Sequence, residues 1–165
     1  MSVGRRHVTN GFGLENINVT VERGVKVNEF MQTSMPNVYA AGDVTGFSML
    51  AHTASREAEV AVNHMLGIDD RMVYNAIPGV VYTNPEVCGT GMTEEQAQKA
   101  GIEYTVHKLP MTYSGRFVAE NEGATGLCSI LVTPNKKSPW SIHVGYSFER
   151  IHWACMHGHY HRHYC

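Results

Sequence analysis

Apolar residues recur at helical spacing in one long stretch of the chain, from Met49 to Leu66. The apolar positions within it are Ala51, Ala54, Ala58, Ala61, Val62, Met65 and Leu66. Residues spaced in this way share one face of an α-helix. Gly67 follows directly, and glycine commonly occupies the position just after a helix end. The pattern therefore predicts a helix from Met49 to Leu66.

Two short segments before this helix have the pattern of β-strands. Gly24 to Asn28 alternates apolar and polar residues, and Asn37 to Ala41 is a more buried run that ends at Gly42 and Asp43. Ser2 to Asn18 has no helical periodicity and has the pattern of an exit from a sheet followed by a loop. We therefore expect the first part of the chain to be a piece of an α/β region rather than a complete domain.

The second half of the chain predicts an α+β unit with a mainly antiparallel sheet. Gly67 to Asn75 carries charged residues without periodicity, as a surface linker does, and separates this unit from the first. A helix is predicted from Thr93 to Ala100, because Thr93 and Gln96 have capping-box spacing and Gly101 follows. The predicted strands are Ala76 to Tyr82, Glu103 to Leu109, Gly126 to Val132 and Ser141 to Gly145, with turns at Gly115, Gly123 and Pro134-Asn135.

Composition narrows the functional classes. The chain has 165 residues, 43% of them hydrophobic, and a net charge of -2 with lysines and arginines scattered singly. Because there is no continuous basic stripe, no nucleic-acid partner is expected. No apolar run approaches the roughly 20 residues that span a bilayer, so no membrane partner is expected either. The cysteines have no Cys-x-x-Cys spacing, which favours reduced structural thiols.

The segment from Thr33 to Asp43 carries the candidate chemistry. It predicts a buried strand followed by a permissive glycine, Gly42, and a carboxylate, Asp43. Open α/β sheets bind ligands at the carboxyl ends of their strands, where such a carboxylate can accept a hydrogen bond from a ligand hydroxyl. On physical grounds alone, Asp43 could equally cap the turn that follows.

The same run resembles the second flavin-contacting motif of the FAD-dependent pyridine-nucleotide disulfide oxidoreductases, and the resemblance continues through Val44-Thr-Gly and Met49-Leu-Ala-His-Thr-Ala. It implies that the carboxylate binds the ribityl chain of FAD. It also implies that the next helix directs its N-terminus at the flavin ring, where partial positive charge suits an electron-rich ring. The histidine in that helix is then a polar neighbour of the cofactor rather than an acid or base. The residues assigned to the cofactor are Gly42, Asp43, Met49, Leu50, Ala51 and His52.

Flanking segments fit the same family in the correct order. Gly4-Arg-Arg and Gly13-Leu-Glu are similar to the exit from its NAD-binding domain. Tyr82-Thr-Asn-Pro-Glu, Gly91-Met-Thr-Glu-Glu-Gln, Ser114-Gly-Arg and Asn121-Glu-Gly are similar to its dimer-interface domain.

The fold expected from this resemblance is a remnant of the FAD/NAD-binding α/β region followed by most of an α+β, mainly antiparallel dimerisation domain. Residues 1–20 would end the NAD-binding domain and residues 21–70 would be the C-terminal segment of the FAD-binding domain. Residues 71–165 would form the dimerisation domain, atypical after about Thr133.

Within the family, Met49-Leu-Ala-His and Pro85-Glu-Val are most similar to the dihydrolipoamide dehydrogenases, with glutathione and mercuric reductases as alternatives. That resemblance implies FAD and NAD as cofactors and oxidation of protein-bound dihydrolipoamide with NAD+ as acceptor. It implies a homodimer, and lipoyl-bearing proteins of 2-oxoacid dehydrogenase or glycine cleavage complexes as partners. The expected location is the cytoplasm, or the mitochondrial matrix in a eukaryote.

The departures from the family pattern predict that this chain alone is inactive. The redox cysteine pair and the Gly-rich dinucleotide turns belong to a portion that precedes these motifs in the family. The C-terminal His-Pro motif with its glutamate is not matched after Thr133, where we expect a reading-frame slip or a gene fragment, with a diverged functional tail as the alternative. A non-catalytic dimerising module is a second hypothesis.

The chain ends in a histidine-rich segment that could bind metal. His157, His159, His161 and His163 alternate and would share one face of an extended chain. Because a terminal segment without packed supporting residues does not orient ligands, adventitious uptake is the preferred interpretation and a metal-binding protein the third hypothesis.

Overall fold

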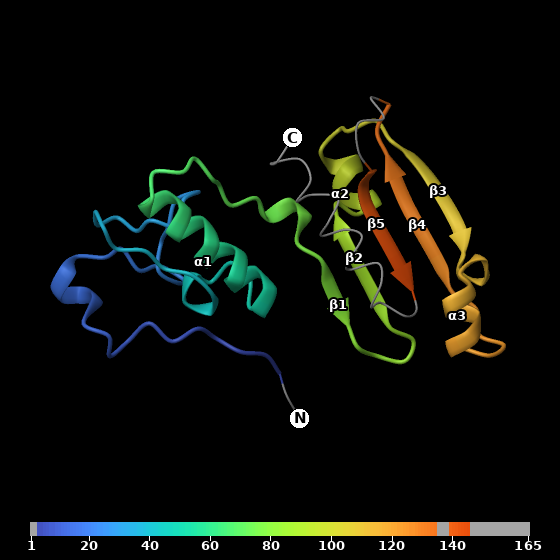
Figure 1. The fold of residues 1–165 in the computed structure, drawn as a ribbon, viewed down its shortest axis with the longest axis horizontal. Coiled ribbons are helices and arrows are strands. Elements are labelled where there is room, and N and C mark those ends of the chain that lie inside the picture. The colour runs from blue at the N-terminus through green and yellow to red at the C-terminus, as the bar shows by residue number, and fades with distance from the viewer. Residues whose placement is uncertain (1–2, 135–138, 146–165) are drawn as a thin grey trace. The chain divides into compact units, whose positions relative to one another are not determined.

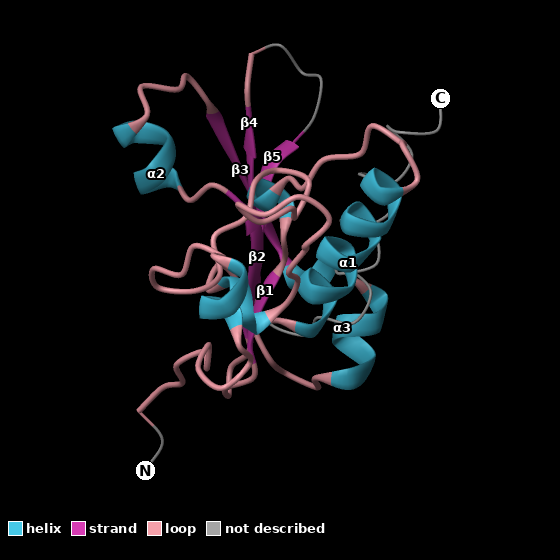
Figure 2. Ribbon diagram, turned by 90° about the vertical axis from the view of Figure 1, so that its left-hand side faces the viewer, coloured by secondary structure: helices cyan, strands magenta, loops and turns pink. Residues whose placement is uncertain are grey.

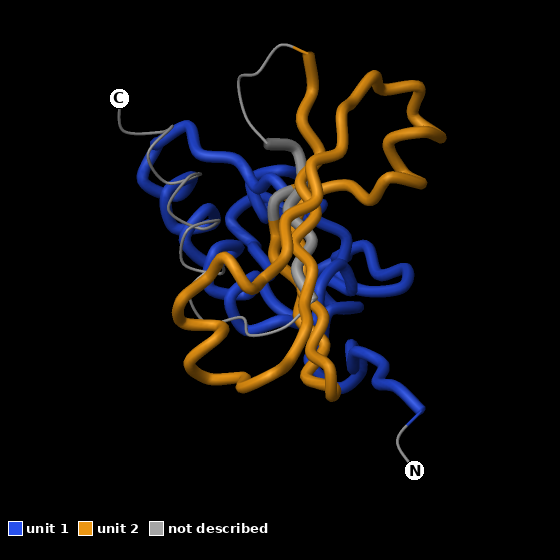
Figure 3. Tube along the Cα trace, turned by 90° about the vertical axis from the view of Figure 1, so that its right-hand side faces the viewer, with its two compact units in different colours: residues 1–73 blue, residues 74–165 orange. Residues whose placement is uncertain are grey.

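The computed structural model describes residues 3–134 and 139–145, the latter by their backbone. It divides into a first unit, residues 1–73, and a second unit, residues 74–165 (Figure 3). Each unit is described by itself. The predicted histidine-rich segment and most of the atypical tail lie outside the described residues.

The first unit contains one α-helix, α1, Ala51–Met65 (Figure 1). Two short 3-10 turns, Leu14–Ile17 and Asp43–Thr45, precede it, and the remaining chain is irregular. The helix predicted from Met49 to Leu66 is thus confirmed with slightly shorter ends. Gly67 follows with φ of 78°, a conformation that glycine adopts without steric cost.

The buried face of α1 differs from the predicted apolar stripe. Its buried residues are Thr53, Glu57, Val60 and Ala61. In contrast, Val62 is 51% exposed and Leu66 is 71% exposed. Of the apolar positions that predicted the helix, only Ala61 is among its buried residues. Two of the buried side chains are polar and have hydrogen-bond partners, so the inward face does not follow apolar periodicity.

The predicted strands Gly24 to Asn28 and Asn37 to Ala41 were wrong. Each contributes one residue, Val25 or Tyr39, to an isolated antiparallel bridge. A strand needs a neighbour that takes up successive backbone groups in one ladder. Here the N–H of Val25 instead donates to the carbonyl of Val44 at 2.8 Å, in the loop before α1. Both segments are therefore hydrogen-bonded to neighbouring loops.

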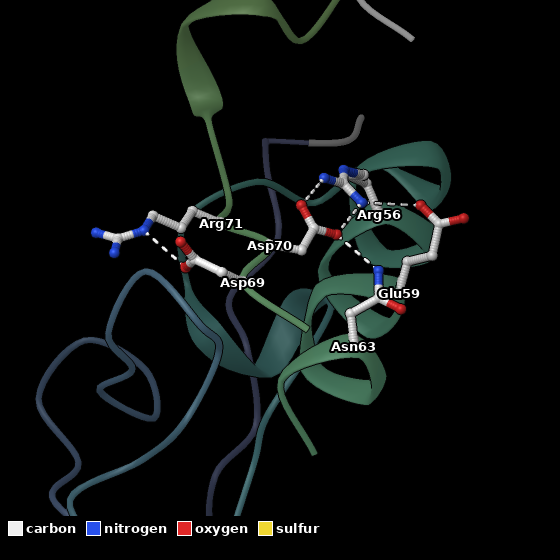
Figure 4. Close-up of polar contacts among 6 residues, drawn as sticks. All are labelled: Arg56, Glu59, Asn63, Asp69, Asp70 and Arg71. Atoms are coloured by element: carbon white, nitrogen blue, oxygen red, sulfur yellow. Dashed lines mark hydrogen bonds and ion pairs between the residues drawn. The ribbon is translucent and has the colours of Figure 1, made fainter. Parts of the chain in front are cut away.

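The segment predicted as a surface linker, Gly67 to Asn75, is anchored to α1. The carboxylate of Asp70 accepts two hydrogen bonds from the guanidinium of Arg56, at 2.5 and 2.8 Å, and one from Asn63 at 2.8 Å (Figure 4). The hydrogen bond from Arg56 lowers the pKa of Asp70. Met72, further along, is buried. Residues 67–73 of this stretch therefore belong to the packed part of the first unit, which ends at Val73.

The second unit is a five-stranded antiparallel sheet with the order β1-β2-β5-β4-β3 (Figure 1). The strands are β1 Gly79–Val81, β2 Val87–Gly91, β3 Thr105–Pro110, β4 Leu127–Val132 and β5 Pro139–Gly145. The four predicted strands are confirmed within a few residues. The strand β2 was not predicted, because the glycines at its third and fifth positions weaken the strand pattern.

One row of side chains across this sheet forms part of its core. Paired residues lie on the same face of a sheet. Val80 pairs with Cys88, and both Cys88 and Cys128 pair with the backbone of Val144, so the side chains of Val80, Cys88 and Cys128 lie in one row. Leu109 pairs with Cys128 on the outer strand and is 46% exposed. Buried Met111 and Phe117 join Cys88 in a core cluster against which Val80 and Cys128 also pack. This part of the core therefore lies between this face and the segment from Met111 to Phe117, while Leu131 and Ala97 are buried elsewhere in the unit.

Two short helices lie on opposite faces of the sheet (Figure 2). In α2, Glu94–Lys99, the predicted capping box is confirmed: Thr93 accepts from the N–H of Gln96, whose side chain accepts from the N–H of Thr93. The helix α3, Gly115–Glu120, occupies a position predicted as a turn. Its start is capped by Ser114, which accepts from the N–H of Phe117 at 3.3 Å.

Within the described part of the chain, no helix combines the length and the hydrophobicity needed to cross a membrane.

Replacing Asp70 with Asn should lower the free energy of unfolding by roughly 1–3 kcal/mol at neutral pH, because the partly buried pair with Arg56 loses its charge. The pKa of Asp70 is lower in the folded chain than its ordinary value of 3.8. The stabilisation is thus complete above that ordinary value and is lost as the pH falls through the lower, folded-state pKa. Urea unfolding at neutral and acidic pH measures this. Asp69→Asn, at a side chain 77% exposed, is the control, and an equal loss in both variants would contradict the prediction.

Replacing Gly24 with Ala should destabilise the first unit by roughly 1–3 kcal/mol through overpacking. A methyl group there would lie 2.5 Å from the carbonyl carbon and oxygen of Thr45 and 2.7 Å from the carbonyl oxygen of Val44. Backbone atoms this close must move. Gly115→Ala, where nothing lies within 4 Å, is the control and should not destabilise the chain. Thermal unfolding of both variants compares them, and an unchanged midpoint for Gly24→Ala would rule out the close approach.

Candidate functional site

Gly42 adopts a backbone conformation that only glycine tolerates. Its φ is 82° and its ψ is -158°, and the residue is buried. A methyl group at this position would also lie 3.3 Å from Cβ of Ala54 in α1. The absent side chain therefore allows both the sharp change of direction and the close packing of this turn on the helix.

Asp43 follows as the first residue of a 3-10 turn that the backbone itself stabilises. The carbonyl of Gly42 accepts from the N–H of Thr45 at 3.0 Å and from its hydroxyl at 2.9 Å. The carbonyl of Asp43 accepts from the N–H of Gly46 at 3.1 Å. The turn has no side-chain cap, and the exposed Asp43 carboxylate has no hydrogen-bond or ion-pair partner among the described residues. Capping, the alternative function of Asp43, is therefore not observed, and the carboxylate is available to a ligand.

Glu57 holds the Gly42 turn against α1. Its side chain is 0% exposed, and its Oε2 accepts a hydrogen bond from the N–H of Gly42 at 2.5 Å. Sequence analysis did not identify this residue. Glu57 and the exposed Glu59 lie two positions apart in a helix rich in alanine, and the pattern does not distinguish them.

The start of α1 combines apolar side chains with uncapped backbone. Met49 is 44% exposed and Leu50 is 37% exposed. Leu50 is the N-cap, and no side chain caps the helix there. The first N–H groups of the helix therefore present partial positive charge. Ala51 is exposed and His52 is half-buried. Because Gly42 contacts Ala54 and Glu57, its turn lies beside the first half of the same helix.

The two cysteines of the described residues are structural thiols. Cys88 is buried and Cys128 is half-buried. Burial raises the pKa of the Cys128 thiol, which keeps it protonated and poorly nucleophilic. Within residues 3–134 and the backbone-described strand β5, no group of three or more metal-binding side chains occurs.

Among curated proteins, this chain is 45% identical over 133 residues to dihydrolipoyl dehydrogenase of Thermus scotoductus, an alignment of 79% of this chain and 28% of the relative. It is 41% identical over 131 residues to mitochondrial dihydrolipoyl dehydrogenase of Homo sapiens, covering 78% of this chain and 26% of the relative. The chain thus spans about a quarter of the length of these relatives.

Two solved structures have the same fold over most of the chain. LpdA of Mycobacterium tuberculosis matches with a TM-score of 0.79 at 23% identity, covering 88% of this chain and 32% of that protein. The HOCl-induced flavoprotein disulfide reductase RclA of Escherichia coli matches with a TM-score of 0.74 at 22% identity, covering 93% and 36%.

Two family models match the chain in sequence. Residues 1–58 match the pyridine nucleotide-disulphide oxidoreductase model, and residues 77–144 match the dimerisation domain of the same family. The two matches follow one another in the order predicted from the motifs. The chain belongs to the pyridine nucleotide-disulphide oxidoreductase family.

Proposed function

We propose that this chain supplies one side of the flavin site of a dihydrolipoyl dehydrogenase. The observation that carries the proposal is the exposed Asp43 carboxylate, which has no partner among the described residues and lies at a glycine-only turn hydrogen-bonded to α1. The relatives that share 41–45% of its residues are named dihydrolipoyl dehydrogenases, which supports this choice of enzyme.

The proposed contacts follow from the chemistry of each group. The carboxylate of Asp43 accepts a hydrogen bond from a ribityl hydroxyl, and Gly42 allows the backbone to approach closely. The exposed side chains of Met49 and Leu50 offer apolar contact to a ring. Ala51 and the half-buried His52 begin the helix whose uncapped N–H groups favour negative charge. When bound, FAD would supply the two-electron chemistry between a dithiol and NAD+.

In the complete enzyme we assign residues 1–20 to the end of the NAD-binding domain and residues 21–70 to the FAD-binding domain. Residues 71–165 would form the dimerisation domain. The substrate is then protein-bound dihydrolipoamide, and the partners are lipoyl-bearing proteins of 2-oxoacid dehydrogenase or glycine cleavage complexes. This assignment is supported by the names of the relatives and by the two matched family models.

The isolated chain is proposed to be inactive. A dithiol–disulfide exchange needs two cysteines close together, and Cys88, Cys128, Cys155 and Cys165 include no pair spaced by four residues. The sequence also contains no Gly-x-Gly-x-x-Gly turn to hold a dinucleotide pyrophosphate on a helix N-terminus. The residues present can therefore position a flavin but cannot pass electrons from a dithiol to it.

Self-association through the sheet is the second proposed property. Val81 pairs with Val87, and Val87 and Leu127 both pair with Gly145, so the three side chains lie in one row on one face. They are 56%, 53% and 48% exposed. An exposed apolar row on a domain matched to a dimerisation model favours a second copy of the chain as its partner.

The flavin proposal predicts weak, saturable quenching of FAD fluorescence by the purified chain, with FAD lost on desalting. Asp43→Asn should raise the dissociation constant about threefold, because the amide oxygen still accepts the hydrogen bond but no longer carries a charge. Asp69→Asn, at an exposed carboxylate, should leave it unchanged. If the unaltered chain does not quench FAD fluorescence in a saturable way, the flavin assignment is wrong. Measurable turnover of NADH with lipoamide by the pure chain would instead disprove the proposed inactivity.

The dimer proposal predicts that size-exclusion chromatography with light scattering gives the mass of two chains. Val87→Glu should shift the chain to monomer, because it places a charge in the apolar row. Leu109→Glu is the matched control. Leu109 is 46% exposed but pairs with Cys128, in the row of the opposite face, so its substitution should leave the dimer intact. A stable monomer before any substitution would refute self-association.

A further inference from the structure

Glu57 is an acidic residue in a place where acids are seldom found. Its side chain is completely buried, on the same face of α1 as Thr53 and Val60. Burial of an acidic side chain costs free energy unless hydrogen bonds compensate for the lost water. An apolar residue of similar length would pack here at lower cost. The contact that Glu57 makes with Gly42 therefore indicates what the residue contributes.

Gly42 is held on both of its peptide groups. Its N–H donates to Oε2 of Glu57, and its carbonyl accepts from both the N–H and the hydroxyl of Thr45. These contacts come from two directions, one from α1 and one from the following turn. With both peptide groups fixed, the only free rotations between Gly42 and the carboxylate are those of Asp43 itself.

The other supports of the turn do not replace Glu57. Gly24 packs against the backbone of Thr45, and Val25 donates to the carbonyl of Val44, so both act after Asp43 in the sequence. Ala54 contacts the turn only by packing. Glu57 supplies a hydrogen bond from α1 to the residue that directly precedes Asp43.

We propose that Glu57 is a positioning residue of the flavin site, which orients the Asp43 carboxylate by binding the N–H of Gly42. The inference rests on the proposed flavin function. Through this hydrogen bond, the direction of the carboxylate and the start of α1 are linked in one rigid unit. The carboxylate that would bind the ribityl chain and the helix start that would contact the flavin ring then keep a fixed distance and orientation relative to each other.

The test measures two quantities separately in the full chain: the protection of the Gly42 amide and the affinity for FAD. Hydrogen exchange at the Gly42 amide is followed by NMR without FAD, and FAD affinity is measured by flavin fluorescence. Glu57→Ala should speed exchange and raise the dissociation constant, each about tenfold. Glu57→Gln keeps an acceptor oxygen on a side chain of the same length, so each effect should be about threefold.

Val60→Ala is the stability control. Val60 is 0% exposed on the same face of α1, and its truncation leaves a cavity without touching Gly42. It should lower the unfolding midpoint. The rate of hydrogen exchange at the Gly42 amide, relative to that of neighbouring amides, should not change, and neither should the FAD affinity. If Glu57→Ala does not fold, Glu57→Gln decides the question through the same two readouts.

The outcomes separate the two proposals. Unchanged Gly42 exchange and unchanged FAD affinity in Glu57→Gln and Glu57→Ala would overturn the positioning role while leaving flavin binding intact. Faster exchange with unchanged affinity would also overturn it, because the turn would then be irrelevant to the ligand. If the unaltered chain binds no FAD, the flavin function fails, and with it the role of Glu57 toward that ligand, whatever its hold on the turn.

Discussion

The hydrogen bond from Gly42 to Glu57 is the constraint on which the first unit depends most. In the described residues this unit has one α-helix and only isolated bridges, so no sheet ladder fixes its loops. The loop conformations are instead determined by individual contacts, some between loops and some to α1. Glu57 binds the turn before Asp43, and Arg56, its neighbour in sequence, binds Asp70 at the other end of the unit. A single helix thus organises segments on both sides of it in the sequence.

The second unit is stabilised in a different way. Its strands pair in continuous antiparallel ladders, and one face of the sheet carries a core built from Cys88, Met111 and Phe117. Backbone hydrogen bonds and apolar burial are distributed over many residues, so no single polar contact determines the arrangement. In our proposals, the ligand site lies in the first unit and the association surface in the second.

Local sequence signals predicted the elements whose formation depends on neighbours in the chain. Thr93 and Gln96 cap a helix because each reaches the other's backbone, and that information lies within four residues. The position of α1 was also predictable. Its buried face was not, because Glu57 is buried against the Gly42 turn, fifteen positions earlier in the sequence. For the same reason Gly24 to Asn28 had a strand pattern without a partner strand, whereas β2 paired despite its two glycines.

The site shows the same limit. The local pattern of a glycine and a carboxylate made Asp43 a candidate for either ligand binding or capping, and the resemblance to the flavin-contacting motif favoured the ligand. Nothing in the sequence indicated that Glu57 would reach back fifteen positions to Gly42. The order of the strands has a further consequence, for cooperativity. The strand β5 lies between β2 and β4, so without residues 139–145 the other four described strands would form two separate antiparallel pairs. Because isolated two-stranded pairs are marginally stable in water, the two halves of this sheet depend on β5 to stabilise each other.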